Sequence, residues 1–305
     1  MMMLLMNRGA DLRARTREGD TPLHVAASSG HVLATTCLLE KSHSLALSSL
    51  QTAVNRLGHT PLMKSVMRGT FQMTRCMLED AGRTFTTRVE HPSSIVGVET
   101  NMGWTLLSLA VRAATMTREE RDKQVGGGGG SGGGGSGGGG AGGEGKEGEE
   151  EEDPRDSVVV LEMVRKYEPD VEMFTKSGLS PLILACGDGL LAVVEYLLDA
   201  FQCDPNSQND TGFAPLHAAA RGGHDAIVLS LLRHGADLSI EDLEGWTSLH
   251  FAAKAGHATT CGTLVKEGGK DLLSIKNVRG ESAARVAFKW GKSEVLETLS
   301  YYEEE

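Results

Sequence analysis

The sequence predicts an all-α fold, a helix-turn-helix solenoid that carries a disordered glycine-rich and acidic insertion. Seven stretches of the chain start on a glycine and share residue types at fixed distances from it, a self-similarity typical of repeat architectures. Residues 126–145 hold 16 of the 39 glycines, which marks the insertion. The composition is that of a globular protein, with 40% hydrophobic and 23% charged residues. The seven anchor glycines are Gly19, Gly58, Gly103, Gly178, Gly212, Gly245 and Gly280.

The start of each unit predicts a short helix. Two positions after the anchor glycine lies threonine or serine in six of the seven units, and proline follows in four. A hydroxyl at this point accepts a hydrogen bond from the free N–H groups of a helix start, and proline is well tolerated in the first turn. Eleven residues after the anchor a second glycine, absent only where Ala114 replaces it, predicts the end of that helix.

The rest of each unit predicts a second helix that packs on the first. Seven residues after every anchor lies a small side chain, which allows close helix packing. An apolar pair follows at nineteen and twenty residues, as in Leu38-Leu39, Leu197-Leu198 and Leu231-Leu232. One such unit cannot bury its own apolar face, so the units must stack.

Three segments carry a family resemblance: "GDTPLHVAASSGH" (Gly19–His31), "GFAPLHAAARGGH" (Gly212–His224) and "GWTSLHFAAKAGH" (Gly245–His257). They resemble the ankyrin repeat, as does the following "LLRHGADLSIEDLEG". The resemblance covers nearly all of the chain except the glycine-rich tract. It implies a non-catalytic protein–protein interaction scaffold, without cofactor or metal, that binds a protein partner on its concave face. The unit at Gly280 lacks the proline and leucine of the pattern and is expected to cap the stack.

The predicted organisation has three parts. Residues 1–114 hold an N-terminal half-repeat, two repeats and the first helix of the third. Residues 115–156 form the insertion, and residues 157–305 hold the second helix of the third repeat, three further repeats and the cap. The half-repeat at Leu4–Gly19 suggests a longer array, although Met1–Met6 could instead form a cap. The alternative function is therefore a targeting or regulatory segment of a larger enzyme or channel.

The glycine-rich tract is predicted to be a surface loop inside the third repeat. The stretch Ser157–Tyr167 has the apolar spacing of a second helix, so the tract lies between the two helices of one unit. "GAGGEGKE" (Gly140–Glu147) nearly matches a phosphate-binding loop, but Glu147 replaces the hydroxyl that would hold magnesium. Glycine and serine favour flexible coil, and acidic low-complexity sequence stays solvated.

Charge, histidines and cysteines exclude several function classes. Residues 144–153 hold seven acids and one lysine, which is −6 of the formal net charge of −11, so nucleic-acid binding is not expected. Six of the ten histidines recur in phase at two repeat positions, which indicates hydrogen bonding between repeats and not a metal site. Cys37 and Cys76 are expected to fill the core. Five scattered cysteines predict reduced thiols in an intracellular protein, in the cytoplasm or alternatively the nucleus. The absence of a long apolar run predicts no membrane insertion, and the chain is expected to be a monomer.

The candidate partner-binding residues directly follow four successive anchor glycines: Trp104, Leu179, Phe213 and Trp246. In an ankyrin-type array this position lies where turn meets first helix, on the concave side. Helices in adjacent repeats lie about 8–10 Å apart, so the four side chains could form one apolar stripe. Aromatic residues are common at interface hot spots. The alternative is that each ring packs over the neighbouring turn and only stabilises the array.

Overall fold

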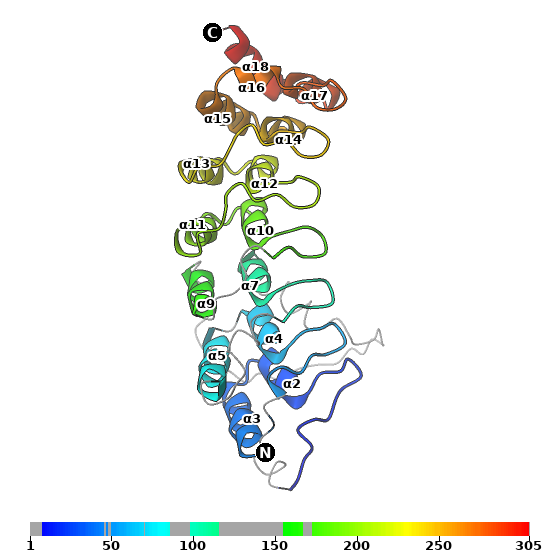
Figure 1. The fold of residues 1–305 in the computed structure, drawn as a ribbon, viewed down its shortest axis with the longest axis vertical. Helices are drawn as coiled ribbons and strands as arrows, with labels where there is room; N and C mark the ends of the chain where they lie inside the picture. The colour runs from blue at the N-terminus through cyan, green and yellow to red at the C-terminus, as the bar shows by residue number, and fades with distance from the viewer. Residues whose placement is uncertain are drawn as a thin grey trace, which may run out of the picture.

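The computed structural model describes residues 8–45, 47, 50–69, 71–85, 98–115, 155–166 and 173–304. Figure 1 shows their helices in two columns, with the first helix of each unit in one column and the second in the other. The first helices are α2 (Pro22–Ser28), α4 (Pro61–Arg68), α7 (Leu106–Thr115), α10 (Pro181–Gly187), α12 (Pro215–Gly222), α14 (Ser248–Ala255) and α17 (Ala283–Lys289). The second helices are α3 (Val32–Ser44), α5 (Phe71–Phe85), α9 (Arg155–Arg165), α11 (Leu191–Ala200), α13 (Asp225–Arg233), α15 (Ala258–Gly268) and α18 (Ser293–Glu304).

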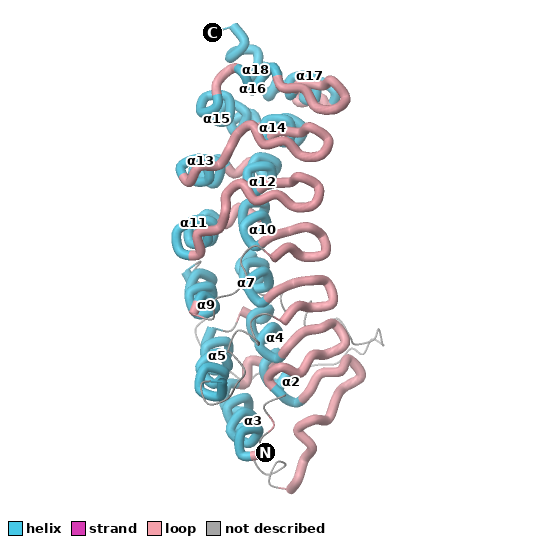
Figure 2. Tube along the Cα trace, viewed as in Figure 1, coloured by secondary structure: helices cyan, strands magenta, loops and turns pink. Residues whose placement is uncertain are grey.

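The described parts of the connections between units form loops that project beyond the column of first helices (Figure 2). A short helix, α16 (Asp271–Ser274), lies in the last of them. The described residues contain no strand, only one isolated bridge between Lys276 and Ser282. The prediction of an all-α helix-turn-helix solenoid is therefore confirmed.

The third unit is completed by α9, which comes after the glycine-rich tract. This helix packs on α7 and lies between α5 and α11 of the neighbouring units. It spans Arg155–Arg165, two residues earlier at each end than the predicted Ser157–Tyr167. The first helix of the unit ends at Thr115. Of the predicted insertion, residues 115–156, Thr115 is the last residue of α7 and residues 155–156 begin α9, while residues 116–154 lie outside the described residues.

The helix ends follow the predicted chemistry. The hydroxyls of Thr60 and Ser180 accept hydrogen bonds from backbone N–H groups three residues on, at 3.2 Å in each case. Gly69, Gly223 and Gly256 end their helices in the left-handed conformation. These caps satisfy backbone groups that a short helix would otherwise leave without partners.

Stacking of the units forms one continuous apolar core. Helix α12 packs between α10 and α14, and α13 lies beside it. The small residues seven positions after the anchors, Ala185, Ala219 and Ala252 among them, are fully buried, as close helix packing requires. Leu216 on α12 and Leu231 on α13, two helices that pack on each other, are both buried. Each unit therefore buries its apolar face against its neighbours, because it has no core of its own.

Two sets of histidines join neighbouring repeats, which confirms the prediction of a structural role. His24, His217 and His250 each bond through Nε2 to a carbonyl oxygen of the loop that leads into the next repeat, at 2.9–3.1 Å. His224 and His257 each bond to a carbonyl oxygen at the end of the first helix of the preceding repeat, those of Gly187 and Arg221 respectively. In the first set, Nδ1 accepts a backbone N–H at 3.2 Å, so Nε2 carries the ring proton and the imidazole is neutral.

This geometry predicts that the protein loses stability in mild acid. Burial is the largest cause that lowers the pKa of His24, His217 and His250 below the ordinary value of 6.5. The native state therefore resists protonation, whereas the unfolded chain takes up protons below about pH 6.5, so stability is fully present above that pH and is lost as pH falls through it. We expect the melting temperature, followed by circular dichroism, to fall steadily between pH 7 and pH 5.

A His217→Gln/His250→Gln variant is the control, because glutamine donates a hydrogen bond but does not titrate. Its melting temperature should depend less on pH than that of the native chain. The solvent-exposed His234 works in the opposite direction, since its backbone bond to Ser230 raises its pKa, but solvent weakens that effect. A native melting temperature that is constant from pH 7 to pH 5 would contradict the prediction.

Candidate functional site

The four residues predicted to bind a partner occupy equivalent places where a loop enters a first helix. The backbone N–H of each bonds back to a side-chain oxygen four residues earlier, at 2.8–3.1 Å. This bond holds every one of them in the same position. Phe213 and Trp246 are only 9% and 8% exposed, while Trp104 and Leu179 are half-buried. Their part in binding stays a prediction.

Phe251 on α14 joins two of these rings into a cluster. Its ring lies 5.3 Å from Phe213 in an edge-to-face arrangement and 5.4 Å from Trp246. It thereby links one unit to the next, since Phe213 belongs to the preceding repeat. The rings of His217 and His250 also contact the cluster, 5.6 Å from Phe213 and 5.9 Å from Trp246 respectively. Phe251 could not be predicted from the repeat pattern, because the residue six positions after the anchor differs in type from unit to unit.

A basic side chain covers the ring in three of the units. Arg112 lies 5.3 Å from the centre of Trp104, and Arg221 lies 5.0 Å from that of Phe213. Lys254 lies between two indoles, 5.1 Å from Trp246 and 5.0 Å from Trp290. Such cation–π contacts contribute about 0.5–1 kcal/mol each where solvent reaches them. The sequence signal was a basic residue nine positions after the anchor glycine, which recurs in four units.

We define the cation–aromatic face as the surface formed by Phe213, Arg221, Trp246, Phe251, Lys254 and Trp290. Arg221 and Lys254 are exposed, Phe251 is half-buried, and Trp290 is 54% exposed. All six side chains come from the first-helix column and the loops that enter it. A molecule that approached this face would meet two cations and the accessible parts of Phe251 and Trp290 before it reached the two buried rings.

In the first and last units the residue directly after the anchor glycine is an acid that forms an ion pair, whereas in the third to sixth units it is apolar. Asp20 follows the first anchor glycine, and its carboxylate bonds to Lys64 Nζ at 3.2 Å and to Asn55 Nδ2 at 2.8 Å. Asp20 and Lys64 are 7% and 6% exposed. In the last unit Glu281 pairs with Lys289 at 2.9 Å. The apolar stripe is therefore limited to the third to sixth units, which carry Trp104, Leu179, Phe213 and Trp246.

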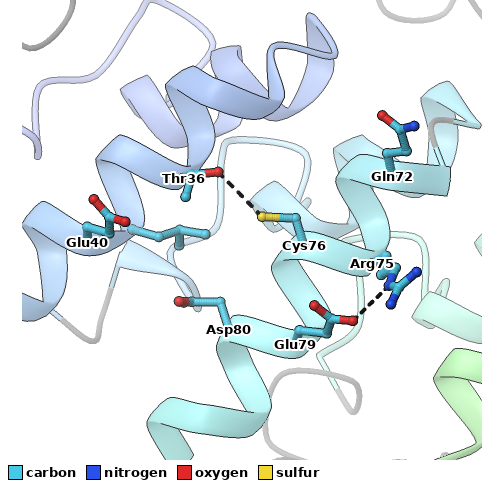
Figure 3. A pocket seen from close by; sticks show the side chains of 8 residues that line it. Thr36, Glu40, Gln72, Arg75, Cys76, Glu79 and Asp80 are labelled. Carbon is cyan, nitrogen blue, oxygen red and sulfur yellow. Dashed lines mark hydrogen bonds and ion pairs between the residues drawn. The ribbon is translucent and has the colours of Figure 1, made fainter.

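A separate groove of about 360 Å³ lies between the second helices α3 and α5, on the other column. Figure 3 shows Thr36 and Cys76 facing each other across it, with Oγ1 and Sγ 3.7 Å apart, and Arg75 bonded to Glu79. The expectation that Cys37 and Cys76 fill the core is wrong, because both are only half-buried and Cys76 lines this groove. The cause is the position of both cysteines on the outer side of the helix pair, one residue before the buried apolar pair.

The described part of the chain offers little to a metal or a nucleophilic mechanism. It contains no group of three histidine, cysteine or acidic side chains arranged to hold a metal ion. Burial raises the pKa of the Cys261 thiol to about 12 and also raises that of Cys186, so both stay protonated at neutral pH. Among the described helices, none is both long and apolar enough to cross a bilayer.

Comparison with known proteins gives consistent matches. A family model described as ankyrin repeats (3 copies) matches residues 1–84, 155–242 and 228–305. The 26S proteasome non-ATPase regulatory subunit 10 of Dictyostelium discoideum is 41% identical over 58 residues, 19% of this chain and 25% of that protein. The ankyrin repeat-containing protein P1E11.10 of Schizosaccharomyces pombe is 36% identical over 62 residues, 20% of this chain and 30% of that protein.

Among solved structures, the crystal structure of the ankyrin repeat domain of Bcl-3 matches with a TM-score of 0.64 and 21% identity. The match covers 93% of this chain and all of that one, and at this identity it shows the fold alone. The aligned part of this chain spans at most about a third of the length of the curated relatives given above.

Proposed function

The chain belongs to the ankyrin repeat family, whose repeats generally mediate protein–protein interaction, and from this premise we propose that it is a scaffold that binds a protein partner on the concave face of its array. The proposal includes no catalytic step, in keeping with a fold that is typically non-catalytic. Within that face, the cation–aromatic face is the proposed contact surface. Trp104 and Leu179 extend it toward the N-terminal repeats, with Phe213 and Trp246 as its floor.

The observation that carries the proposal is the fixed arrangement of exposed side chains over buried rings. Lys254 and Arg221 rest on aromatic faces, and the rings beneath them are held by backbone hydrogen bonds and by Phe251. Arginine and tryptophan are among the residues that contribute most to binding at interfaces. Side chains that are already ordered lose less conformational entropy when a partner binds, which favours affinity.

We expect a variant with Arg221→Ser, Lys254→Ser and Trp290→Ser to lose a partner that the native chain captures from a lysate of its source. All three side chains reach solvent, so the fold should be retained, and a melting curve checks this. Losing two charged contacts and one aromatic contact should weaken binding by about a hundredfold or more.

The matched control is Leu229→Ser, Arg233→Ser and Lys266→Ser on α13 and α15, which removes the same charge and one exposed apolar group from the other column of helices. This control should still capture the partner. If the control loses the partner and the first variant keeps it, binding uses the second helices and the proposed face is wrong.

A further inference from the structure

Resting on the proposed function, we propose that the partner presents a segment in the polyproline II conformation with carboxylates three residues apart, and that these pair with Arg221 and Lys254. Three features support this proposal: the two cations have no carboxylate partner among the described residues, they lie one repeat apart along the stack, and an aromatic surface lies between them.

The first step is that both cations lack a carboxylate partner within the described residues. Three other basic side chains of the array have carboxylate partners: Lys64 pairs with Asp20, Lys289 with Glu281 and Arg233 with Glu195. Arg221 and Lys254 instead lie on rings, in a chain whose formal net charge is −11. A cation that stacks on a ring keeps hydrogen-bond donors available for an anion. The pair is therefore an anion-binding element that the chain itself leaves open.

The second step is the spacing of the two side chains. Arg221 lies in the last turn of α12 and Lys254 in the last turn of α14, each nine residues after the anchor glycine of its repeat. Packed helices lie about 8–10 Å apart, and α12 packs directly on α14. A polyproline II segment has three residues per turn and rises about 3.1 Å per residue, so residues i and i+3 point the same way about 9 Å apart. A β-strand would point them to opposite sides.

The third step is the surface between the cations. Phe251 lies between the Phe213 and Trp246 rings, and the exposed Trp290 continues the aromatic surface beyond Lys254. Proline-rich segments in the polyproline II conformation dock on aromatic-lined grooves. The residues between the two carboxylates would therefore be prolines or other apolar residues in contact with Phe251 and Trp290.

A nucleic acid fits the same face less well. The loops that flank it carry exposed acids, including Asp210 and Glu241, which would repel a continuous row of phosphates. Two discrete carboxylates can instead be placed on the two cations with uncharged residues elsewhere. Arginine also matches a carboxylate with two parallel hydrogen bonds.

The test measures binding of labelled nine-residue peptides to the full chain by fluorescence anisotropy. The probe has three Glu-Pro-Pro units. One comparison peptide has three Gln-Pro-Pro units, and another has the probe's composition with its three glutamates adjacent. We expect the probe to bind at least tenfold more tightly than either, because only it places carboxylates at the required spacing. Equal binding of the glutamine peptide or of the adjacent-glutamate peptide would overturn the inference.

Two variants locate the binding. Arg221→Glu/Lys254→Glu should weaken binding of the probe at least tenfold, whereas Arg233→Glu/Lys266→Glu makes the same change in net charge on the second helices and should leave it unchanged. Arg221→Met/Lys254→Met repeats the test without acidic residues, in case charge reversal unfolds the chain. Equal losses in the two glutamate variants would show a general charge effect and overturn the inference, as would tighter binding of a single-stranded oligonucleotide.

The outcome is separable from that of the proposed function. If the captured partner depends on the cation–aromatic face but none of the peptides binds, the scaffold function stands and the chemistry assigned to the bound segment is wrong. If neither partner capture nor peptide binding depends on the cation–aromatic face, the proposed contact surface and the chemistry assigned to the bound segment are both wrong.

Discussion

Replacing Lys64 with methionine should lower the free energy of unfolding by about 3–5 kcal/mol, the usual cost of breaking a buried ion pair. Methionine retains most of the packing of the lysine stem, so the loss comes mainly from charge. The Asp20 carboxylate is 7% exposed and would keep only Asn55 as a partner, at 2.8 Å. Urea unfolding followed by circular dichroism measures the change, and hydrogen exchange should show the loss mainly in α2 and α4, because repeats couple only to their neighbours.

Two controls isolate the buried charge. Asp20→Asn with Lys64→Met removes both charges but keeps an acceptor for Asn55, so it should recover most of the lost stability. Arg233→Met breaks a pair whose side chains are 69% and 44% exposed, with atoms 3.8 Å apart, and should cost less than about 1 kcal/mol. If Lys64→Met costs no more than Arg233→Met, the pair at the N-terminal end is not a stabilising feature of the array.

Gly223→Ala should cost about 2–4 kcal/mol. Gly223 ends α12 with φ at +75°, where a side chain costs about 1–2 kcal/mol. In addition, a Cβ at this position would lie 2.6 Å from Nδ1 of His257, whose ring must stay close in order to bond to the Arg221 carbonyl at 3.1 Å. Moving the ring would lose that bond and part of the contact between two repeats.

Gly235→Ala is the matched control, because Gly235 has a similar φ of +87° but nothing within 4 Å of an added Cβ. It should cost only the backbone term of about 1–2 kcal/mol. Thermal and urea unfolding of both variants give the difference. Equal losses would mean that the histidine ring moves aside at no cost and that the bond between the repeats is not needed for stability.

Stability and the proposed recognition depend on the same residues in this array. The bond from His257 to the Arg221 carbonyl holds the end of α12, from which the Arg221 side chain extends over Phe213. His217 and His250 support the rings under the two cations. Mild acid should therefore weaken both the stack and the cation–aromatic face, which gives binding and stability the same direction of pH dependence.

Much of the fold could be predicted because each repeat position has a local cause. The threonines and serines mark helix starts through a hydrogen bond three residues away, and the glycines mark helix ends through their backbone freedom. Seven copies in phase turned weak local signals into a firm register. The recurrence of His24, His217 and His250 in phase predicts hydrogen bonding between repeats, although it does not identify the partner carbonyls. The candidate residues Trp104, Leu179, Phe213 and Trp246 were found in the same way.

The sequence by itself determined the helices, their order, the stacking and the place of the glycine-rich tract between α7 and α9, because periodic apolar positions and caps act within a single repeat. Only the tertiary structure decided what covers each candidate residue. Phe251 meets Phe213 across a repeat boundary, and Lys254 lies between rings from two units. Such contacts depend on the distance and angle between neighbouring helices, which no spacing along one chain segment specifies. For the same reason Cys76, beside a buried pair in sequence, lies on the wall of a groove.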